Sequence, residues 1–199
     1  MIFFSFFRKF VHLPNQTKQI KKMKTPTNQI SKANLLFLIL FALTSVLEAQ
    51  QMLPPVKVLN GQGRMIDIST IQSHGKPVLM IFWKLSDMAS CKNLETIFQT
   101  VNDSLQDENV KIVAICTDDA HSSLQVKPWL MAKEMDVELY FDTNGELRRA
   151  LGVNPPFTFL FDKNMKVFCK QSGYCSGNES ILCSKIRDCI NEIREESSD

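Results

Sequence analysis

Apolar and polar residues follow two different periods between residues 56 and 194 of the chain. Short apolar or alternating runs, typical of strands, occupy residues 56–59, 64–68, 78–83, 110–116, 137–141, 157–161 and 166–170. Apolar residues at the spacing of helices occur instead around residues 94–105, 124–135, 146–151 and 180–194. This order of elements predicts an α/β fold in which helices flank a central mixed β-sheet.

Turn residues between these runs indicate how neighbouring strands connect. Residues 60–63 (Asn-Gly-Gln-Gly) predict an N-terminal β-hairpin, and residues 162–164 (Asp-Lys-Asn) predict a second antiparallel hairpin. The helix after residues 78–83 is expected to start at Ser86 or Asp87, because either side chain can accept hydrogen bonds from the first free N–H groups of a helix. In the last helix we expect burial of Ile181, Ile186, Ile190 and Ile193.

The first 49 residues are typical of a secretory signal peptide. Lysines precede an apolar run over residues 35–47, and the small residue Ala49 follows it. The run is shorter than the roughly 20 residues that a membrane-spanning helix needs. We therefore expect cleavage after Ala49, one mature domain over residues 50–199, and a periplasmic or secreted location. A retained membrane anchor is the alternative, and Met23 is an alternative start of translation.

Composition and charge restrict the function classes. The chain is 44% hydrophobic and 22% charged, which is typical of a soluble domain with a packed core. Its formal net charge of +2 gives no indication of nucleic-acid binding, since much of the basic excess lies before residue 35. The sequence contains no glycine-rich phosphate loop, so no cofactor is expected.

All six cysteines lie in the expected mature domain, at positions Cys91, Cys116, Cys169, Cys175, Cys183 and Cys189. Disulfides persist outside the cytoplasm, and the sequence alone does not choose among the pairings. A bond between Cys175 and Cys183 is preferred, because it would fix the preceding loop to the last helix; unpaired cysteines are the alternative. Cys116 lies in an apolar strand and is expected to be buried. The spacings are wider than those of zinc sites, so no metal is expected.

Four stretches carry a resemblance to a known family. They are residues 75–83 (GKPVLMIFW), 110–119 (VKIVAICTDD), 151–162 (LGVNPPFTFLFD), and 172–174 with 177–179 (SGY and GNE). In this order they resemble the thioredoxin-like redoxins of the TlpA/ResA type, which are exported bacterial thiol–disulfide oxidoreductases related to the AhpC/TSA proteins. The resemblance implies a thioredoxin fold.

The resemblance also implies where a redox site would lie. In the family, a cysteine at the start of the helix after residues 78–83 attacks a disulfide, and a second cysteine three residues later resolves the mixed disulfide. Counted without gaps, these positions are Asp87 and Ser90 in this chain, and neither side chain carries sulfur. A one-residue gap would align Cys91 with the second position, where it is either a packing residue or a reactive thiol. Pro156 matches the family's cis-proline, whose loop binds extended peptides.

Two functions are open from the sequence. The first is a degenerate redoxin without dithiol activity, exported from the cytoplasm, that binds a protein or peptide partner or serves as an assembly component. The second is an active thiol–disulfide oxidoreductase in cell redox homeostasis, which uses Cys91 as a single thiol or together with another cysteine. The exposure and pKa of Cys91 discriminate between them, because the thiolate is the reactive form. Membrane contact is expected only if the signal segment is retained.

Overall fold

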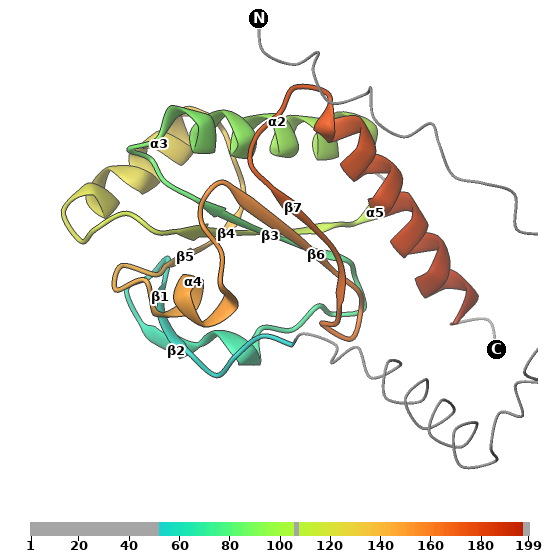
Figure 1. Cartoon of the computed structure of the whole chain (residues 1–199), viewed down its shortest axis with the longest axis horizontal. Helices are drawn as coiled ribbons and strands as arrows, with labels where there is room; N and C mark the ends of the chain where they lie inside the picture. The colour runs from blue at the N-terminus through green and yellow to red at the C-terminus, as the bar shows by residue number, and fades with distance from the viewer. Residues whose placement is uncertain (1–51, 106–107, 197–199) are drawn as a thin grey trace, which may run out of the picture. The chain divides into compact units, whose positions relative to one another are not determined.

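A seven-stranded mixed sheet forms the centre of the computed structural model of the protein, which describes residues 52–105 and 108–196. The strand order is β2-β1-β5-β4-β3-β6-β7 (Figure 1). The strands are β1 (Lys57–Asn60), β2 (Met65–Asp67), β3 (Val78–Trp83), β4 (Lys111–Cys116), β5 (Glu138–Phe141), β6 (Phe157–Phe161) and β7 (Val167–Ser172). Strands β3, β4 and β5 run parallel to one another, whereas β6 is antiparallel to β3 and β7 is antiparallel to β6.

Four α-helices in the described part of the chain cover the sheet. They are α2 (Met88–Ser104), α3 (Val126–Ala132), α4 (Glu146–Leu151) and α5 (Asn178–Glu195), with 3-10 turns η1 (Ile68–Thr70) and η3 (Ser122–Gln125). Figure 1 shows α2 and α4 on opposite sides of the strands. Buried residues of α2, α3 and α5 join one core cluster, and Leu147 of α4 joins the other. Within residues 52–105 and 108–196, no helix has the length and apolar character that crossing a membrane requires.

Side-chain alternation along β3 lets this strand contribute to both cores. Leu79, Ile81 and Trp83 belong to the cluster beneath α2. Val78, Met80 and Phe82 belong to the cluster on the α4 side. All six side chains are fully buried, as expected for a continuous apolar run in a strand that is covered on both faces. Burial of one such side chain stabilises the folded state by about 1.5–3 kcal/mol. β3 is therefore fixed in the core, and so is the point from which the following loop and helix start.

The predicted α/β fold with its N-terminal hairpin is confirmed. β1 and β2 pair antiparallel, β6 and β7 form the second hairpin, and the bounds of β3 and α4 are those expected. The expected helical stretch at 124–135 is shorter, because α3 ends at Ala132 and Glu134 adopts a positive φ of 55°. The expected signal segment, residues 1–49, lies outside the described residues.

The buried face of α5 differs from the expected one at its first turn. Ile181 is 60% exposed, so the prediction that it is buried is wrong. The buried residues of α5 are Leu182, Cys183, Ile186, Cys189 and Ile190. Positions 182, 186, 189 and 190 follow one helical face, and position 181 stands one residue, or about 100°, away from it.

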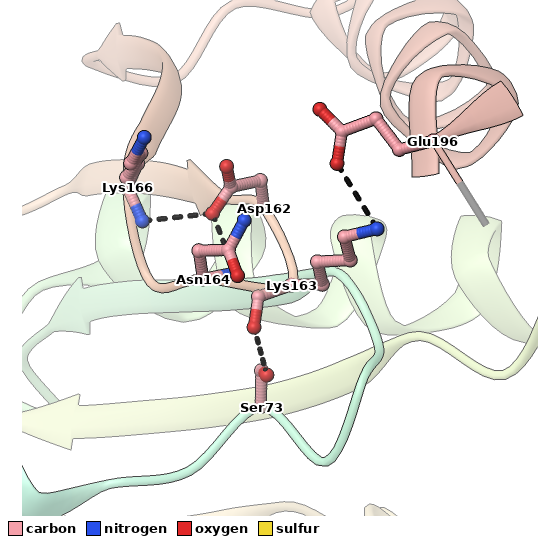
Figure 2. A network of polar contacts seen from close by, with 6 residues as sticks. All are labelled: Ser73, Asp162, Lys163, Asn164, Lys166 and Glu196. Atoms are coloured by element: carbon pink, nitrogen blue, oxygen red, sulfur yellow. Dashed lines mark hydrogen bonds and ion pairs between the residues drawn. The ribbon is translucent and has the colours of Figure 1, made fainter. Parts of the chain in front are cut away.

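A polar network links the β6–β7 turn to two other segments of the chain (Figure 2). The Ser73 hydroxyl, in the loop before β3, donates to the backbone carbonyl of Lys163 in this turn. The Lys163 ammonium lies 3.0 Å from a carboxylate oxygen of Glu196, which directly follows α5. The end of the sheet where β6 finishes is therefore tied to both the β3 entry loop and the end of α5.

Candidate functional site at the start of helix α2

Several chain segments meet at the end of the sheet where β3 finishes. The carboxyl ends of the parallel strands β3 and β4 lie at this end, together with the amino end of the antiparallel strand β6. Phe82 pairs with Phe157, the residue that directly follows Pro156. Residues 84–87 connect this end of β3 to α2. The fold thus brings together, at the end of the sheet where β3 finishes, the start of α2 and the Pro156 loop, which the sequence predicts as site elements.

Asp87 is the N-cap of α2, which selects it over Ser86. Its Oδ2 atom accepts hydrogen bonds from the hydroxyl of Ser90 at 2.6 Å and from the backbone N–H of Ser90 at 3.0 Å. The Ser90 hydroxyl is the largest cause that holds the pKa of the Asp87 carboxyl below its usual value. Ser90 itself is fully buried. A carboxylate therefore satisfies the N–H groups and the positive dipole end of the helix.

Cys91 lies in the first turn of α2 and is half-buried. Its Sγ atom lies 3.5 Å from the carbonyl oxygens of both Lys84 and Leu85, so the thiol donates to the loop that precedes the helix. Burial, followed by the carboxylates of Glu95 and Asp118, raises the pKa of the Cys91 thiol. The protonated thiol is therefore the dominant form at neutral pH, which is the opposite of what a nucleophilic cysteine needs.

Asp118, which follows β4, holds the loop between β3 and α2. It is only 3% exposed, and its carboxylate accepts hydrogen bonds from the backbone N–H groups of Leu85 at 2.6 Å and Ser86 at 3.2 Å. The Ser86 hydroxyl also donates to it at 2.7 Å, and the Cys116 thiol donates at 3.3 Å. Sequence reasoning missed this role, and the only signal was an acidic residue two positions after the end of a buried strand.

The Pro155–Pro156 peptide bond is cis, as the resemblance predicts for Pro156. Because proline carries no backbone N–H, these two residues can accept but cannot donate backbone hydrogen bonds. The carbonyl of Pro156 already accepts from the N–H of Gly173 at 2.9 Å. Backbone recognition of a bound peptide at these two residues would therefore rest on the Pro155 carbonyl, and side chains would have to supply the remainder.

All six cysteines are free thiols in the structure. Cys116 is fully buried, as expected, and this burial raises its pKa. Cys175 is exposed and Cys183 is buried, so the Cys175–Cys183 disulfide is not formed in the structure and stays a prediction. Burial also raises the pKa of the thiols of Cys169, Cys183 and Cys189, the last to about 12. Within the described ranges, no cluster of His, Cys, Asp and Glu side chains is suited to hold a metal ion.

Comparison with solved structures identifies the class of protein. An uncharacterized thioredoxin-like protein from Porphyromonas gingivalis matches with 27% identity and a TM-score of 0.63, over 70% of this chain and 92% of that chain. A protein assigned as the thiol:disulfide interchange protein DsbE from Chlorobium tepidum matches with 20% identity and a TM-score of 0.59, over 71% and 96%. A protein assigned as a protein disulfide isomerase from Bacteroides thetaiotaomicron matches with 14% identity and a TM-score of 0.60, over 77% and 97%. The last two likenesses are of fold alone.

The fold and these likenesses define a thioredoxin-like redoxin. The AhpC/TSA family model matches residues 49–169, and the chain belongs to this family. The matched range includes both the start of α2 and the Pro156 loop. A search of the curated proteins gave no match to the chain.

Proposed function

We propose that this protein is an exported thioredoxin-like protein that lacks dithiol chemistry and binds a protein or peptide partner at the start of α2 and the Pro156 loop. The observation that carries the proposal is the hydrogen-bonded pair of Asp87 and Ser90 at the helix start. Thiol–disulfide exchange forms and breaks sulfur–sulfur bonds, and neither of these side chains can form one. The helix end that would stabilise a thiolate is occupied by a carboxylate instead.

Exposed apolar surface at the same edge supports partner binding. Met88, the first residue of α2, is 88% exposed and follows the Asp87 cap directly. Methionine is flexible and polarisable, and it is common at protein-binding surfaces. The hydrogen bonds from the 84–86 loop to Asp118 fix the segment before it, and a fixed surface loses less conformational entropy on binding.

The alternative is a thiol–disulfide oxidoreductase that uses Cys91. The functions assigned to two structural neighbours favour it, since one is assigned as a thiol:disulfide interchange protein and the other as a protein disulfide isomerase. The environment of Cys91 disfavours it, because burial and nearby carboxylates raise its pKa. A reactive thiol at this position would need the reverse shift.

A redox assay separates the two functions. We expect the full chain and its Cys91→Ala variant to reduce insulin disulfides no faster than the dithiothreitol background. The Asp87→Cys/Ser90→Cys double variant should exceed that background, because it restores two thiols at a helix start that can stabilise a thiolate. Wild-type turnover that disappears in Cys91→Ala would contradict the proposal and support the alternative.

Alkylation of the native protein provides a second measurement. Cys175 is exposed, so it should react with iodoacetamide quickly, whereas Cys91 should label slowly at neutral pH and quickly only after unfolding. Peptide mapping by mass spectrometry assigns each label to its cysteine. Equal rates for the two thiols in the folded protein would argue for a reactive Cys91.

Partner binding and export are tested in the cells that produce the protein. A photo-crosslinking amino acid at position 88 should capture a protein that the same amino acid at position 65 does not, since Met65 is similarly exposed but lies on β2. Capture at both positions, or at neither, would count against a binding surface at α2. Export predicts a mature N-terminus at Gln50, which sequencing of the periplasmic or secreted protein identifies.

A further inference from the structure

Two cysteines, one on β7 and one on α5, lie in the same layer between the sheet and the helix. Cys169 of β7 pairs with Leu160 of β6, and paired residues of neighbouring strands point to the same face of a sheet. Leu160 belongs to the core cluster that α5 shares, and Cys169 packs against this cluster. Cys189 of α5 belongs to the same cluster and is fully buried. Both side chains therefore lie between the sheet and α5.

The contact between the β6–β7 turn and the end of α5 sets the level of the two cysteines along this layer. Lys163 of the turn lies 3.0 Å from Glu196, and both β6 and α5 run toward this contact (Figure 2). Leu160, the partner of Cys169, stands three residues before Lys163, or about 10 Å along a strand. Cys189 stands seven residues before Glu196, or about 10 Å along a helix. Cys169 and Cys189 therefore lie at nearly the same level.

The electrostatic neighbours of the two thiols agree with this placement. Burial, followed by the carboxylates of Asp162 and Glu192, raises the pKa of the Cys189 thiol, and negative charge on Cys169 adds to the increase. Burial raises the pKa of Cys169, and the ammonium group of Lys185 opposes this shift. Lys185 precedes Cys189 by four residues, which places both on one face of the helix. The Cys169 thiol thus lies close to the part of α5 that carries Cys189.

The two nearest cysteines along the chain are less well placed as partners of Cys169. Cys183 is also buried on α5, but it stands six residues, or about 9 Å, before Cys189 along the helix. A disulfide requires two Cα atoms within about 7 Å of each other. Cys175 is exposed in the loop before α5, where its Sγ atom lies 3.7 Å from the carbonyl oxygen of Ser176. Cys189 is therefore the thiol that α5 offers at the level of Cys169.

We propose that Cys169 and Cys189 form an intramolecular disulfide that fixes α5 to β7, the last strand in the order of the sheet. In the structure both are free thiols, which corresponds to the reduced form of the pair. The pair is separate from the candidate site at the start of α2. Its oxidation in the cell rests on the export proposed above, because disulfides persist outside the cytoplasm.

The oxidant is an external disulfide, either of a protein or of glutathione. It reaches Cys169 first, because Cys169 is half-buried and Cys189 is fully buried. The Cys169 thiolate attacks one sulfur of the oxidant, which gives a mixed disulfide and releases the first thiolate. The Cys189 thiolate then attacks Sγ of Cys169 and releases the second. Two cysteine thiols are oxidised, one external disulfide is reduced, and the two cysteine protons pass to the released thiolates.

The test is oxidation of the reduced full chain with glutathione disulfide at pH 8, followed by alkylation and non-reducing peptide mapping. We expect a linked pair of peptides that contains Cys169 and Cys189. Cys175 is exposed, so it should carry glutathione and show that the oxidant has acted. Free Cys169 and Cys189 in protein whose Cys175 is modified, or a bond from Cys169 to any other cysteine, would overturn the proposal.

Serine variants assign the two members of the pair. Cys189→Ser should leave Cys169 as a mixed disulfide with glutathione, because no thiol remains to resolve it. Cys183→Ser is the matched control, since Cys183 is also buried on α5, and it should form the bond to the same extent as wild type. Circular dichroism shows that each variant is folded. Loss of the bond in folded Cys183→Ser, with retention in Cys189→Ser, would make Cys183 the partner and contradict the proposal.

A melting experiment tests whether the bond fixes α5. The bond closes a loop of about 20 residues, and we expect the oxidised chain to melt about 5–10 °C above the same chain in dithiothreitol. Cys169→Ala should melt at one temperature in both conditions. An oxidised wild-type chain that melts no higher than the reduced one would contradict the proposed role of the bond.

Recovery from cells separates the bond from export. Protein that is alkylated as it is collected from the periplasm or the medium should already contain the Cys169–Cys189 bond. If the bond forms with glutathione disulfide but is absent from protein collected in this way, the pairing is supported and export to an oxidising compartment is contradicted.

Discussion

At the end of the sheet where the α2 site lies, Asp118 follows β4, and at the other end Asp162 follows β6, which runs antiparallel to β3. Each carboxylate accepts hydrogen bonds from two backbone N–H groups. The partners of Asp118 are Leu85 and Ser86, which precede it by 33 and 32 residues. The Oδ1 atom of Asp162 accepts from Asn164 and Lys166, each at 2.8 Å, within its own turn (Figure 2).

Asp118 and Asp162 differ in their burial and in how far along the chain their hydrogen-bond partners lie. The contacts of Asp162 close a local turn that connects neighbouring strands, and such a turn forms largely from its own sequence. Asp118 joins two segments that are adjacent only after β3 and β4 have paired. It therefore positions the entry to α2 through the tertiary fold, and this positioning does not require redox cysteines. This end of the sheet can therefore keep a fixed surface without redox cysteines, as the proposed binding function requires.

The largest expected effect is that of removing the Asp118 carboxylate, and removal of the Asp162 carboxylate is its direct comparison. Asp118→Ala removes a buried acceptor from two backbone N–H groups and a hydroxyl, and we expect it to lower the free energy of unfolding by about 2–3 kcal/mol. Asp162→Ala should cost only about 1 kcal/mol, because its N–H partners can be solvated by water. Urea unfolding followed by circular dichroism measures both. Equal losses of unfolding free energy would show that burial and the sequence separation of the partners do not determine what each carboxylate contributes to stability.

The next effect concerns the N-cap of α2. Asp87→Ala leaves the first N–H groups of the helix without their carboxylate, and we expect a loss of about 1 kcal/mol in unfolding free energy. Because Ser90 is buried, its hydroxyl also loses its acceptor in this variant. Asp87→Ser, which keeps a capping oxygen, is the control and should recover most of the loss. An Asp87→Ala variant as stable as wild type would mean that the carboxylate does not stabilise the start of α2.

The pH dependence of the same residue isolates the contribution of its charge. The pKa of Asp87 is lowered in the folded protein, so its charge stabilises the fold above the unfolded pKa of about 3.9, and this contribution is lost as the pH falls through the folded pKa. Asp87→Asn keeps a good cap without the charge. Its deficit should stay below about 0.5 kcal/mol between pH 5 and 7, since the site is partly exposed, and should vanish once the pH has fallen below the lowered folded pKa of Asp87. A deficit that persists at low pH would assign the effect to geometry and not to charge.

The two carboxylates also explain what could be predicted from the sequence. The apolar runs predicted β3 and α4 with correct bounds, and residues 162–164 predicted the β6–β7 turn, because these signals are local. The role of Asp118 could not be predicted, because its partners become neighbours only through the β3–β4 pairing. The prediction for Ile181 fails for a related reason, since the face that α5 buries is set by the sheet beneath it.

At the candidate site, residue types could be predicted from the sequence but their contacts could not. Asp87 and Ser90 could be located by counting from Trp83, and the cap between them follows from known helix chemistry. The carbonyl groups near the Cys91 thiol come from the loop before α2, and Asp118, one of the carboxylates that raise its pKa, comes from the segment after β4.

The smallest expected effect tests the surface contact at the Asp162 end. Lys163→Ala removes the ion pair with Glu196, in which 61% of the glutamate side chain is exposed. Such a pair contributes about 0.3 kcal/mol and is screened by salt, so the difference from wild type should disappear in about 1 M sodium chloride. The hydrogen bond from Ser73 remains in this variant, since it is made to the backbone carbonyl of residue 163. A loss of unfolding free energy as large as that of Asp118→Ala would mean that the contact between the β6–β7 turn and the end of α5 stabilises the fold as much as the Asp118 contacts do.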